Sequence, residues 1–287
     1  LQDGKATIIS VAHNSNDVLP EMLASVPTGT SIIVVDNATK DLAELRQICK
    51  KFSAMLIENG ENRGFGFACN RGAERAETEF LFFLNPDASL VPDTIDQLIA
   101  AMQRFPKASA MNPRIALADG SVQFHHRSRL MPVSEYMPHR WPETDSDVTV
   151  LMGSALFARR SDFEAVGGFD EDIFLYHEDD DLSRRLRAER GPIMFIRDAF
   201  VTHLAEKSSG SSNATFHFKR YHQARSRVYA AKKHGRGAPF LTAFIGASLA
   251  MLSPEMLYKS SRRAKSWGIM RGVLSTLRDG GKGRGGL

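Results

Sequence analysis

Apolar and polar positions follow a regular alternation over the first 105 residues of the chain. Short runs of consecutive apolar residues, typical of strands that are buried on both faces, are separated by segments whose apolar residues recur at helical spacing. The expected strands cover residues 7–12, 31–36, 54–57 and 79–84, and the expected helices cover residues 17–25, 42–52, 64–76 and 92–105. This pattern predicts an α/β fold in which a mostly parallel, twisted sheet is covered by helices on both faces.

The pattern is less regular beyond residue 110. Residues 119–149 have little periodicity and are expected to form a long surface excursion. The elements expected after it are a strand at 150–158, a short helix from 161, a turn at 167–170, a helix from about 178, a last strand at 192–197 and a basic helix at 216–234. The chain is long enough for one large α/β domain with a helical appendage.

The net charge of +4 conceals an uneven distribution. Residues 204–287 contain 16 Lys and Arg against 3 Asp and Glu, whereas the rest of the chain contains 21 against 30. A basic end favours an anionic partner, such as a phospholipid surface, a pyrophosphate-linked lipid or a nucleic acid. Nucleic acid is not expected, because the aromatic residues do not alternate with the basic ones as a base-stacking surface requires.

The end of the chain has two interpretations. Residues 239–252 are apolar and uncharged, but this stretch is shorter than the roughly 20 residues that a helix needs to span a bilayer. A basic cluster at 259–265 and Trp267 follow, a combination typical of peripheral membrane contact. The alternative is a pair of helices that packs on the body of the protein or on a second subunit of a homo-oligomer, and the sequence leaves both open.

Cys49 and Cys69 form no CxxC motif, so neither a zinc ribbon nor a disulfide framework is supported. The apolar run at residues 8–11 is too short for a secretory signal. A cytoplasmic location is therefore expected, on the inner face of the cytoplasmic membrane if the tail binds lipid.

Four consecutive acidic residues, 178–181, open one of the predicted helices. The structural interpretation is a stabilised first turn, because acidic side chains favour a helix N-terminus and two arginines follow. The functional interpretation is a general base. It gains support from the Asn85-Pro86-Asp87 turn after a buried strand and from His203 after a later strand, since carboxylate and imidazole suit a divalent metal.

Two common nucleotide-binding motifs are absent from the sequence. No GxGxxG follows the first strand and no GxxxxGK[ST] occurs, which disfavours a Rossmann dehydrogenase and a P-loop enzyme. Six other motifs occur in the order seen in family-2 inverting glycosyltransferases. They are Val11-Ala12-His13-Asn14-Ser15, Val34-Val35-Asp36-Asn37-Ala38, Asn62-Arg63-Gly64-Phe65-Gly66, Asn85-Pro86-Asp87-Ala88, Gly167-Gly168-Phe169-Asp170-Glu171 and Glu178-Asp179-Asp180-Asp181-Leu182.

The chain resembles this family over about residues 5–235, and most of all its bacterial rhamnosyltransferase-like branch. The resemblance implies a GT-A fold and a nucleotide-sugar donor. It also implies a glycosyltransferase domain over residues 5–235, with residues 1–110 as the nucleotide-sugar-binding half and residues 111–235 as the acceptor half. The charge and apolar pattern makes residues 236–287 a basic amphipathic extension of that domain.

The resemblance places donor binding on Ala12, His13, Asp36, Asn37, Arg63, Gly64, Asn85 and Asp87. Asp36 ends a strand, where its carboxylate can accept the N3 proton of uracil or thymine; the alternative is a turn aspartate that binds local backbone amides. Ala12 and His13 are expected at the nucleoside, partly through backbone atoms. Arg63 is expected near the diphosphate, and Gly64 permits close approach of the backbone.

Asn85-Pro86-Asp87 departs from the more common Asp-x-Asp of the family. Because the first carboxylate is an amide here, Asp87 is the expected metal ligand, and His203 matches a family position that completes the coordination. One carboxylate together with diphosphate oxygens suits Mg²⁺ or Mn²⁺, and the imidazole favours Mn²⁺. Metal affinity is therefore expected to be weak in the absence of donor.

By the same resemblance Asp179 is the general base, which takes the proton of an acceptor hydroxyl as its oxygen attacks C1 of the sugar. Glu178 is expected to orient the acceptor or Asp179, whereas Asp181 is expected to cap the helix or to pair with a following arginine. A shift of one residue, to Asp180, stays open. The acceptor pocket is expected to contain Gly153, Gly168, Phe169 and Asp170.

The sequence thus predicts an inverting, metal-dependent hexosyltransferase of bacterial cell-surface polysaccharide synthesis. The donor is expected to be dTDP- or UDP-linked, with L-rhamnose from dTDP-rhamnose as the candidate sugar, and the acceptor a glycan carried on a lipid diphosphate. Two alternatives stay open. The altered metal motif suits a non-catalytic nucleotide-sugar-binding module, whereas a sugar nucleotidyltransferase would need a basic Gly-rich loop that residues 11–15 lack.

Overall fold

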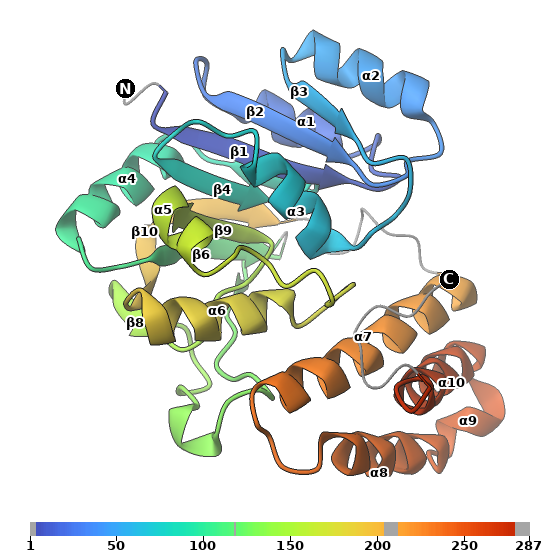
Figure 1. Ribbon diagram of the computed structural model, residues 1–287. Helices are drawn as coiled ribbons and strands as arrows, with labels where there is room; N and C mark the ends of the chain where they lie inside the picture. The colour runs from blue at the N-terminus through green and yellow to red at the C-terminus, as the bar shows by residue number, and fades with distance from the viewer. Residues whose placement is uncertain (1–3, 118, 204–211, 279–287) are drawn as a thin grey trace.

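The computed structural model describes residues 4–117, 119–203 and 212–278, and within these ranges ten strands form one mixed sheet (Figure 1). The strands are β1 (Ala6–Ala12), β2 (Ser31–Asp36), β3 (Met55–Glu58), β4 (Phe80–Leu84), β5 (Ala88–Leu90), β6 (Ala110–Leu117), β7 (Val122–Gln123), β8 (Ser146–Val148), β9 (Ala155–Arg159) and β10 (Ile193–His203). Their order is β3-β2-β1-β4-β9-β6-β10-β5, with β7 beside β6 and β8 beside β10.

The first half of the sheet is parallel, as the sequence predicts. β3, β2, β1 and β4 pair in parallel register, and the helices α1 (Leu19–Ala24), α2 (Leu42–Lys51) and α3 (Phe65–Ala73) connect them. β1 and β4 are buried along their whole length, which explains why β4 is apolar throughout and β1 is apolar except at Thr7 and Ser10.

The prediction of a mostly parallel sheet is wrong for the second half. β9 lies antiparallel between β4 and β6, and β10 is parallel to β6 but antiparallel to β5 and β8. The sequence analysis missed β6 because Asn112, Pro113 and Arg114 interrupt its apolar run. Pro113 is tolerated because it pairs with Ile196 at the edge of an irregularity in β10, where a ladder hydrogen bond is dispensable.

Helices cover both faces of the sheet, as predicted. The further helices of this body are α4 (Thr94–Arg104), α5 (Arg160–Ala165), α6 (Glu178–Glu189) and the short 3₁₀ helix η1 (Val133–Glu135). Apolar residues of α1, α2 and α4 share one core cluster with the sheet. Those of α3, α5 and α6 share a second cluster on the other face.

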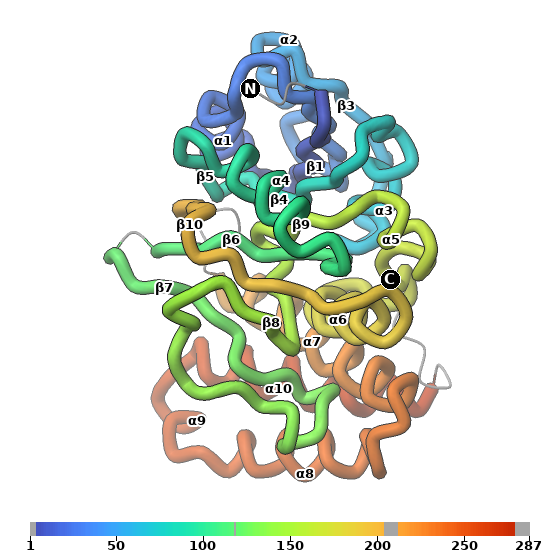
Figure 2. Tube along the Cα trace, turned by 90° about the vertical axis from the view of Figure 1, so that its left-hand side faces the viewer, coloured from blue at the N-terminus to red at the C-terminus, as the bar shows by residue number. Residues whose placement is uncertain are grey.

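The last helices form a separate layer beside the sheet (Figure 2). They are α7 (Asn213–Lys233), α8 (Pro239–Met251), α9 (Glu255–Tyr258) and α10 (Ser260–Ser275). Small residues of α8 and α10 pack on α7, and a Cβ on Gly268 of α10 would lie 2.5 Å from the His217 oxygen of α7. One face of the extension therefore packs on the protein itself, which is one of the two interpretations of this region.

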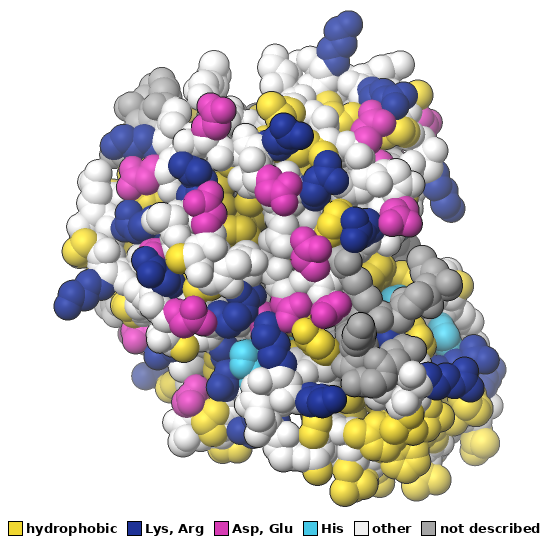
Figure 3. Space-filling view, viewed as in Figure 1, with side chains coloured by type: hydrophobic (Ala, Val, Ile, Leu, Met, Phe, Trp, Pro, Cys, Tyr) yellow, Lys and Arg dark blue, Asp and Glu magenta, His cyan; other side chains and the backbone are white. Residues whose placement is uncertain are grey.

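The outer face of α8 remains exposed. Leu241, Ile245 and Leu249, spaced by four residues, are at least half exposed, and apolar surface gathers over this end of the molecule (Figure 3). None of the helices in the described ranges combines the length and the hydropathy needed to cross a bilayer. Residues 279–287, at the end of the predicted extension, lie outside the described residues.

Candidate functional site

A cavity of about 710 Å³ opens at the carboxyl ends of β1, β2 and β4. Loops after these strands form one wall, and His203 at the end of β10, residues 174–176 and the first half of α7 form the others. This is the edge at which parallel α/β sheets bind ligands. We refer to it below as the donor cavity.

Asn37 organises the loops of the donor cavity. Its side-chain Nδ2 donates to the Asn62 Oδ1 at 2.9 Å and to the Gly64 oxygen at 3.3 Å, and its Oδ1 accepts from the Arg63 N–H at 3.1 Å. Gly64 has φ +93°, and a Cβ there would collide with the backbone oxygen of Phe174. Glycine is therefore required at this position by both conformation and space.

The residues expected at the nucleoside differ in their burial: His13 borders the donor cavity, whereas Ala12 and Asp36 are buried. His13 lines the donor cavity and its Nδ1 lies 2.7 Å from the Asn37 oxygen. Ala12 is fully buried, and its oxygen accepts from the Asn37 N–H. Asp36 is buried too, and its Oδ1 accepts from the Thr39 N–H at 2.8 Å, as the turn interpretation requires. No described residue forms a hydrogen bond with the other oxygen, Oδ2.

Arg63 does not line the donor cavity in this structure, contrary to the expectation that it approaches the diphosphate. Its guanidinium group lies 3.7 Å from the centroid of the Phe67 ring and 3.7 Å from the Glu61 carboxylate. The cation–π contact and the carboxylate both hold the positive charge away from the cavity.

Asp87 and His203 meet in the donor cavity although they are far apart in the sequence. The His203 Nε2 lies 3.2 Å from the Asp87 Oδ1, and both side chains are almost wholly buried. Asn85, at the end of β4, also lines the cavity. The antiparallel pairing of β10 with β5 brings His203 beside Ala88, next to Asp87.

The chemistry of this pair fits a metal. The His203 Nδ1 lies 3.1 Å from the Gln123 Oε1, which orients the ring so that Nε2 faces the Asp87 carboxylate. Imidazole nitrogen and carboxylate oxygen are both ligands that Mn²⁺ accepts. No group of three or more His, Cys, Asp and Glu suited to a metal occurs within the described residues.

Asp179 lies at the start of α6, outside the lining of the donor cavity. Its carboxylate accepts from the Gly153 N–H at 3.0 Å and from the Asp180 N–H at 2.9 Å. Burial and the charge of Asp180 raise its pKa above the usual value for aspartate, although His125 opposes this shift. The geometry thus fixes a carboxylate of increased basicity, with Gly153 as its positioning partner.

Glu178 points into the protein. It is buried beside Cys69, and its Oε2 has no hydrogen-bond partner among the described residues. Burial and the neighbouring Asp179 raise the pKa of Glu178 well above its usual range. Both effects favour the neutral, protonated form of the Glu178 carboxyl.

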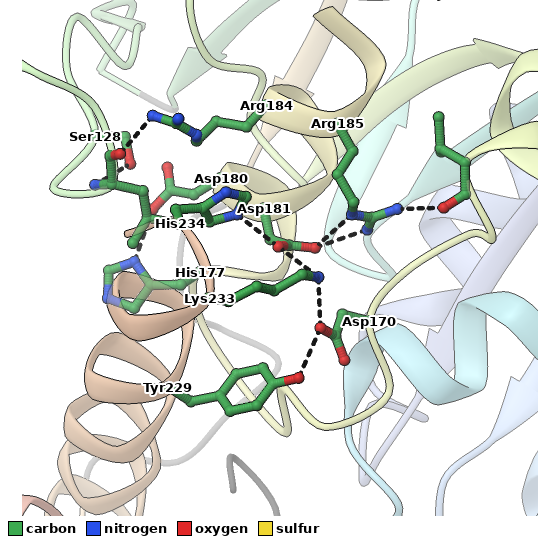
Figure 4. A network of polar contacts seen from close by, with 12 residues as sticks. Ser128, Asp170, His177, Asp180, Asp181, Arg184, Arg185, Tyr229, Lys233 and His234 are labelled. Carbon is green, nitrogen blue, oxygen red and sulfur yellow. Dashed lines mark hydrogen bonds and ion pairs between the residues drawn. The ribbon is translucent and has the colours of Figure 1, made fainter. Parts of the chain in front are cut away.

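Asp181 belongs to a buried ionic network that joins α6 to α7 (Figure 4). Its carboxylate lies within hydrogen-bond distance of the Arg185 Nε, the Lys233 Nζ and the His234 Nε2, each at 2.8 Å. Although burial alone would raise the pKa of Asp181, these three partners lower it to about 2. The predicted pairing with a following arginine is confirmed, and the carboxylate is unavailable as a base.

Three of the residues predicted for the acceptor pocket, Gly168, Phe169 and Asp170, line one cavity, whereas Gly153 lies beside Asp179. The Phe169 side chain itself is buried in the core against Phe83 and Phe163. Gly168 packs on Phe163, and the Asp170 carboxylate accepts hydrogen bonds from Lys233 and Tyr229 (Figure 4). In this structure, Gly168 and Asp170 therefore stabilise the fold through packing and hydrogen bonds.

Sequence analysis missed the contribution of α7 to the donor cavity. Thr215, Phe218 and Lys219 line it, and the Phe218 ring makes an edge contact with Phe174, with centroids 5.9 Å apart. The basic character of α7 was visible in the sequence. Which of its faces meets the cavity depends on packing against α8, α10 and residues 174–176, and no local pattern encodes that.

The fold has solved counterparts. The Staphylococcus aureus TarS fragment 1–349 is 16% identical, with a TM-score of 0.56 over 96% of this chain and 92% of that one. The mannosyltransferase PcManGT of Pyrobaculum calidifontis, solved with GDP-Man and Mn²⁺, is 14% identical, with a TM-score of 0.57 over 96% and 88% of the two chains. Fold and site together define a glycosyltransferase of the GT-A class, as predicted.

The chain belongs to glycosyl transferase family 2, whose profile matches residues 7–167. It is 29% identical to the N-acetylglucosaminyl-diphospho-decaprenol L-rhamnosyltransferase of Mycobacterium tuberculosis, over 90% of this chain and 94% of the relative. It is 28% identical to the rhamnosyltransferase WbbL of Escherichia coli K12, over 79% and 92%. The predicted resemblance to the rhamnosyltransferase branch is thereby confirmed.

Proposed function

We propose that this glycosyltransferase transfers L-rhamnose, with inversion, from dTDP-rhamnose to a glycan carried on a lipid diphosphate, as a step of bacterial cell-surface polysaccharide synthesis. The observation that carries the proposal is the convergence of Asp87 and His203 on a cavity at the carboxyl ends of the parallel strands. The names of the Mycobacterium tuberculosis and Escherichia coli relatives support the choice of sugar, and the former supports the choice of acceptor.

Donor binding follows from the loops around Asn37. The Oδ2 of Asp36, which accepts no hydrogen bond from the described residues, would accept the N3–H of the base, and His13 would border the nucleoside. Gly64 and Lys219 both line the cavity and would meet the diphosphate, whose negative charge a cation offsets. Asp87, His203 and Asn85 would hold a Mn²⁺ or Mg²⁺ ion, which supplies charge stabilisation for the departing diphosphate.

Acceptor activation falls to Asp179. As the acceptor oxygen attacks C1, its proton passes to the Asp179 carboxylate, and the bond from C1 to the diphosphate oxygen breaks. Attack on the face opposite the leaving group inverts the anomeric configuration. The Gly153 N–H would hold the carboxylate in place, and burial together with the charge of Asp180 raises the pKa of Asp179.

The metal role predicts the behaviour of Asp87→Asn. We expect this variant to bind dTDP-rhamnose at least about tenfold more weakly than the wild type in Mn²⁺, because it loses a charged ligand, and to match the wild type in chelator. Calorimetric titration of a nucleotide-sugar panel in Mn²⁺, Mg²⁺ and chelator measures both quantities. Asp198→Asn, an exposed aspartate of β10, is the matched control.

Each outcome of that titration is informative. Unchanged Mn²⁺ dependence in Asp87→Asn contradicts the metal site. Selective binding of UDP-linked sugars contradicts the dTDP donor. Donor binding without turnover on any acceptor favours the non-catalytic module, and pyrophosphate release from a nucleoside triphosphate would favour the nucleotidyltransferase.

The outer face of α8 predicts binding to membranes. Its exposed leucines and isoleucine lie close in sequence to the basic residues of α10, a combination that binds anionic lipid surfaces. We expect the triple variant Leu241→Gln, Ile245→Gln, Leu249→Gln to bind anionic vesicles at least about tenfold more weakly, because each lost side chain forfeits on the order of 1 kcal/mol. Sedimentation with vesicles measures this. Equal binding by the triple variant and by Val133→Gln, an exposed apolar control, would contradict the proposal.

A further inference from the structure

A second cavity, of about 210 Å³, lies next to the donor cavity between α7, α8 and α10. Arg129, Arg220 and Arg227 line it together with His177 and Gln223. Ala243 of α8 and Ile269 and Val273 of α10 form its apolar side. A small cavity with three guanidinium groups on one side and hydrocarbon on the other suits an anion that is attached to an apolar chain. We refer to it as the arginine cavity.

The positive charge of the arginine cavity is not neutralised by the residues around it. Within residues 4–117, 119–203 and 212–278, none of the three arginines forms an ion pair with a carboxylate. Among the described residues, the side chain of Arg220 donates to the uncharged Gln223 Oε1. Burial, and then the like charge of the nearby Arg129, lower the pKa of Arg227.

An anion relieves that repulsion. Guanidinium groups present several N–H donors in a fixed fork and are weakly hydrated, so they bind phosphate oxygens in pairs of parallel hydrogen bonds. Three of them around one small cavity match a diphosphate, which carries its oxygens on two adjacent phosphorus atoms. The apolar side continues through the packed core of α7, α8 and α10 towards the exposed face of α8.

The two cavities are lined by neighbouring residues of the same two segments, α7 and the chain around residues 174–177. Residues 174–176 and the α7 residues Phe218 and Lys219 line the donor cavity, whereas His177, Arg220 and Gln223 line the arginine cavity. Tyr176 and His177 both adopt left-handed backbone conformations, with φ of 65° and 71°, so the chain turns sharply between the cavities. Asp179 follows His177 by two residues. The wall of the arginine cavity therefore leads directly into the segment that carries the proposed base.

We propose that Arg129, Arg220 and Arg227 bind the diphosphate of the lipid-linked acceptor, and that its hydrocarbon chain leaves along α8. This inference rests on the proposed function, because it assigns the acceptor of that same reaction to a place. On this proposal the diphosphate determines which acceptors bind well, because a glycan without a diphosphate has no anion for the three arginines to bind.

The test compares acceptors with and without the anion. Full-length enzyme transfers rhamnose to N-acetylglucosamine carried either on a short-chain lipid diphosphate or on an uncharged alkyl chain. For Arg129→Gln and for the double variant Arg220→Gln, Arg227→Gln, we expect KM for the diphosphate acceptor to rise at least about tenfold per arginine, as loss of a charged hydrogen bond implies. Their KM for dTDP-rhamnose and for the alkyl acceptor should stay within about twofold. Arg271→Gln, exposed on α10, is the matched control.

Binding of inorganic pyrophosphate, measured with the donor cavity saturated by dTDP, separates the inference from the proposed function. If wild type transfers no sugar to either acceptor, the proposed function fails, while pyrophosphate binding that the arginine variants lose still supports the anion site. If wild type transfers sugar and the variants keep both KM for the diphosphate acceptor and pyrophosphate binding, the inference is overturned. Variants that lose only vesicle binding without acceptor would assign the arginines to phospholipid headgroups, which also overturns it.

Discussion

Asp179→Asn is expected to lower kcat for sugar transfer at least about 10³-fold, while donor affinity stays within about twofold of wild type. The amide keeps the shape of the carboxylate but cannot accept the acceptor proton. Because Asp179 does not line the donor cavity, the nucleotide sugar should bind as before. Single-turnover transfer and calorimetry of donor binding measure the two effects.

Asp180→Asn is the matched control for the base. Its Oδ2 already lies 2.7 Å from the His177 Nδ1, so we expect a smaller loss of activity there. If Asp180→Asn abolished transfer while Asp179→Asn retained it, the base would be Asp180. In wild type, kcat should increase with pH through the raised pKa of Asp179, because only the ionised carboxylate accepts a proton. The residual activity of Asp179→Asn should not show this increase of kcat with pH.

Asp181→Asn is expected to lower the free energy of unfolding by about 2–4 kcal/mol at neutral pH. The wild-type carboxylate is fully buried and shared by Arg185, Lys233 and His234, and the amide leaves these positive groups without their anion. Urea denaturation, followed by circular dichroism, measures the loss. Asp198→Asn, whose side chain is 72% exposed, should change stability by less than about 0.5 kcal/mol.

The pH dependence of that difference has a defined direction. The pKa of Asp181 is about 2 in the folded protein, below its value of roughly 3.9 in an unfolded chain. Its contribution is therefore fully present above the unfolded pKa and disappears as pH falls through the folded one. The stability curves of wild type and Asp181→Asn should converge on acidification towards pH 2. A constant gap would show that packing, not charge, accounts for the loss.

Strand and motif patterns predicted the parallel half of the fold, because β1 and β4 are mostly apolar and the candidate site residues follow directly at their ends. The pairing of Asp87 with His203 was also expected, from the order of motifs. β6 was missed because Pro113 and its polar neighbours conceal a central strand whose partner, β10, has a local irregularity. The irregularity in β10 that accommodates Pro113 is a feature of the tertiary structure, and the sequence around Pro113 does not reveal it.

The side chains of Arg63 and Phe169 do not line the donor cavity, for a common reason. Arg63 and Phe169 stand in motifs that border the site, but one is held by Phe67 and the other by the core. A motif fixes the path of the backbone through a site more reliably than the direction of each side chain. The arginines of the second cavity come from α7 and from the irregular segment before β8, so only the fold brings them together.

One helix, α7, borders both cavities and is held along its length. Polar bonds secure its C-terminal half, through Lys233 and His234 to Asp181, Tyr229 to Asp170 and Ser226 to the Leu175 oxygen. Its N-terminal half packs closely on α10, where Gly268 admits the His217 backbone, and the Phe218 ring contacts Phe174. Because the two cavities have this helix in common, a ligand that shifts α7 on binding in one cavity changes the affinity of the other. By linkage, that change is the same factor in each direction.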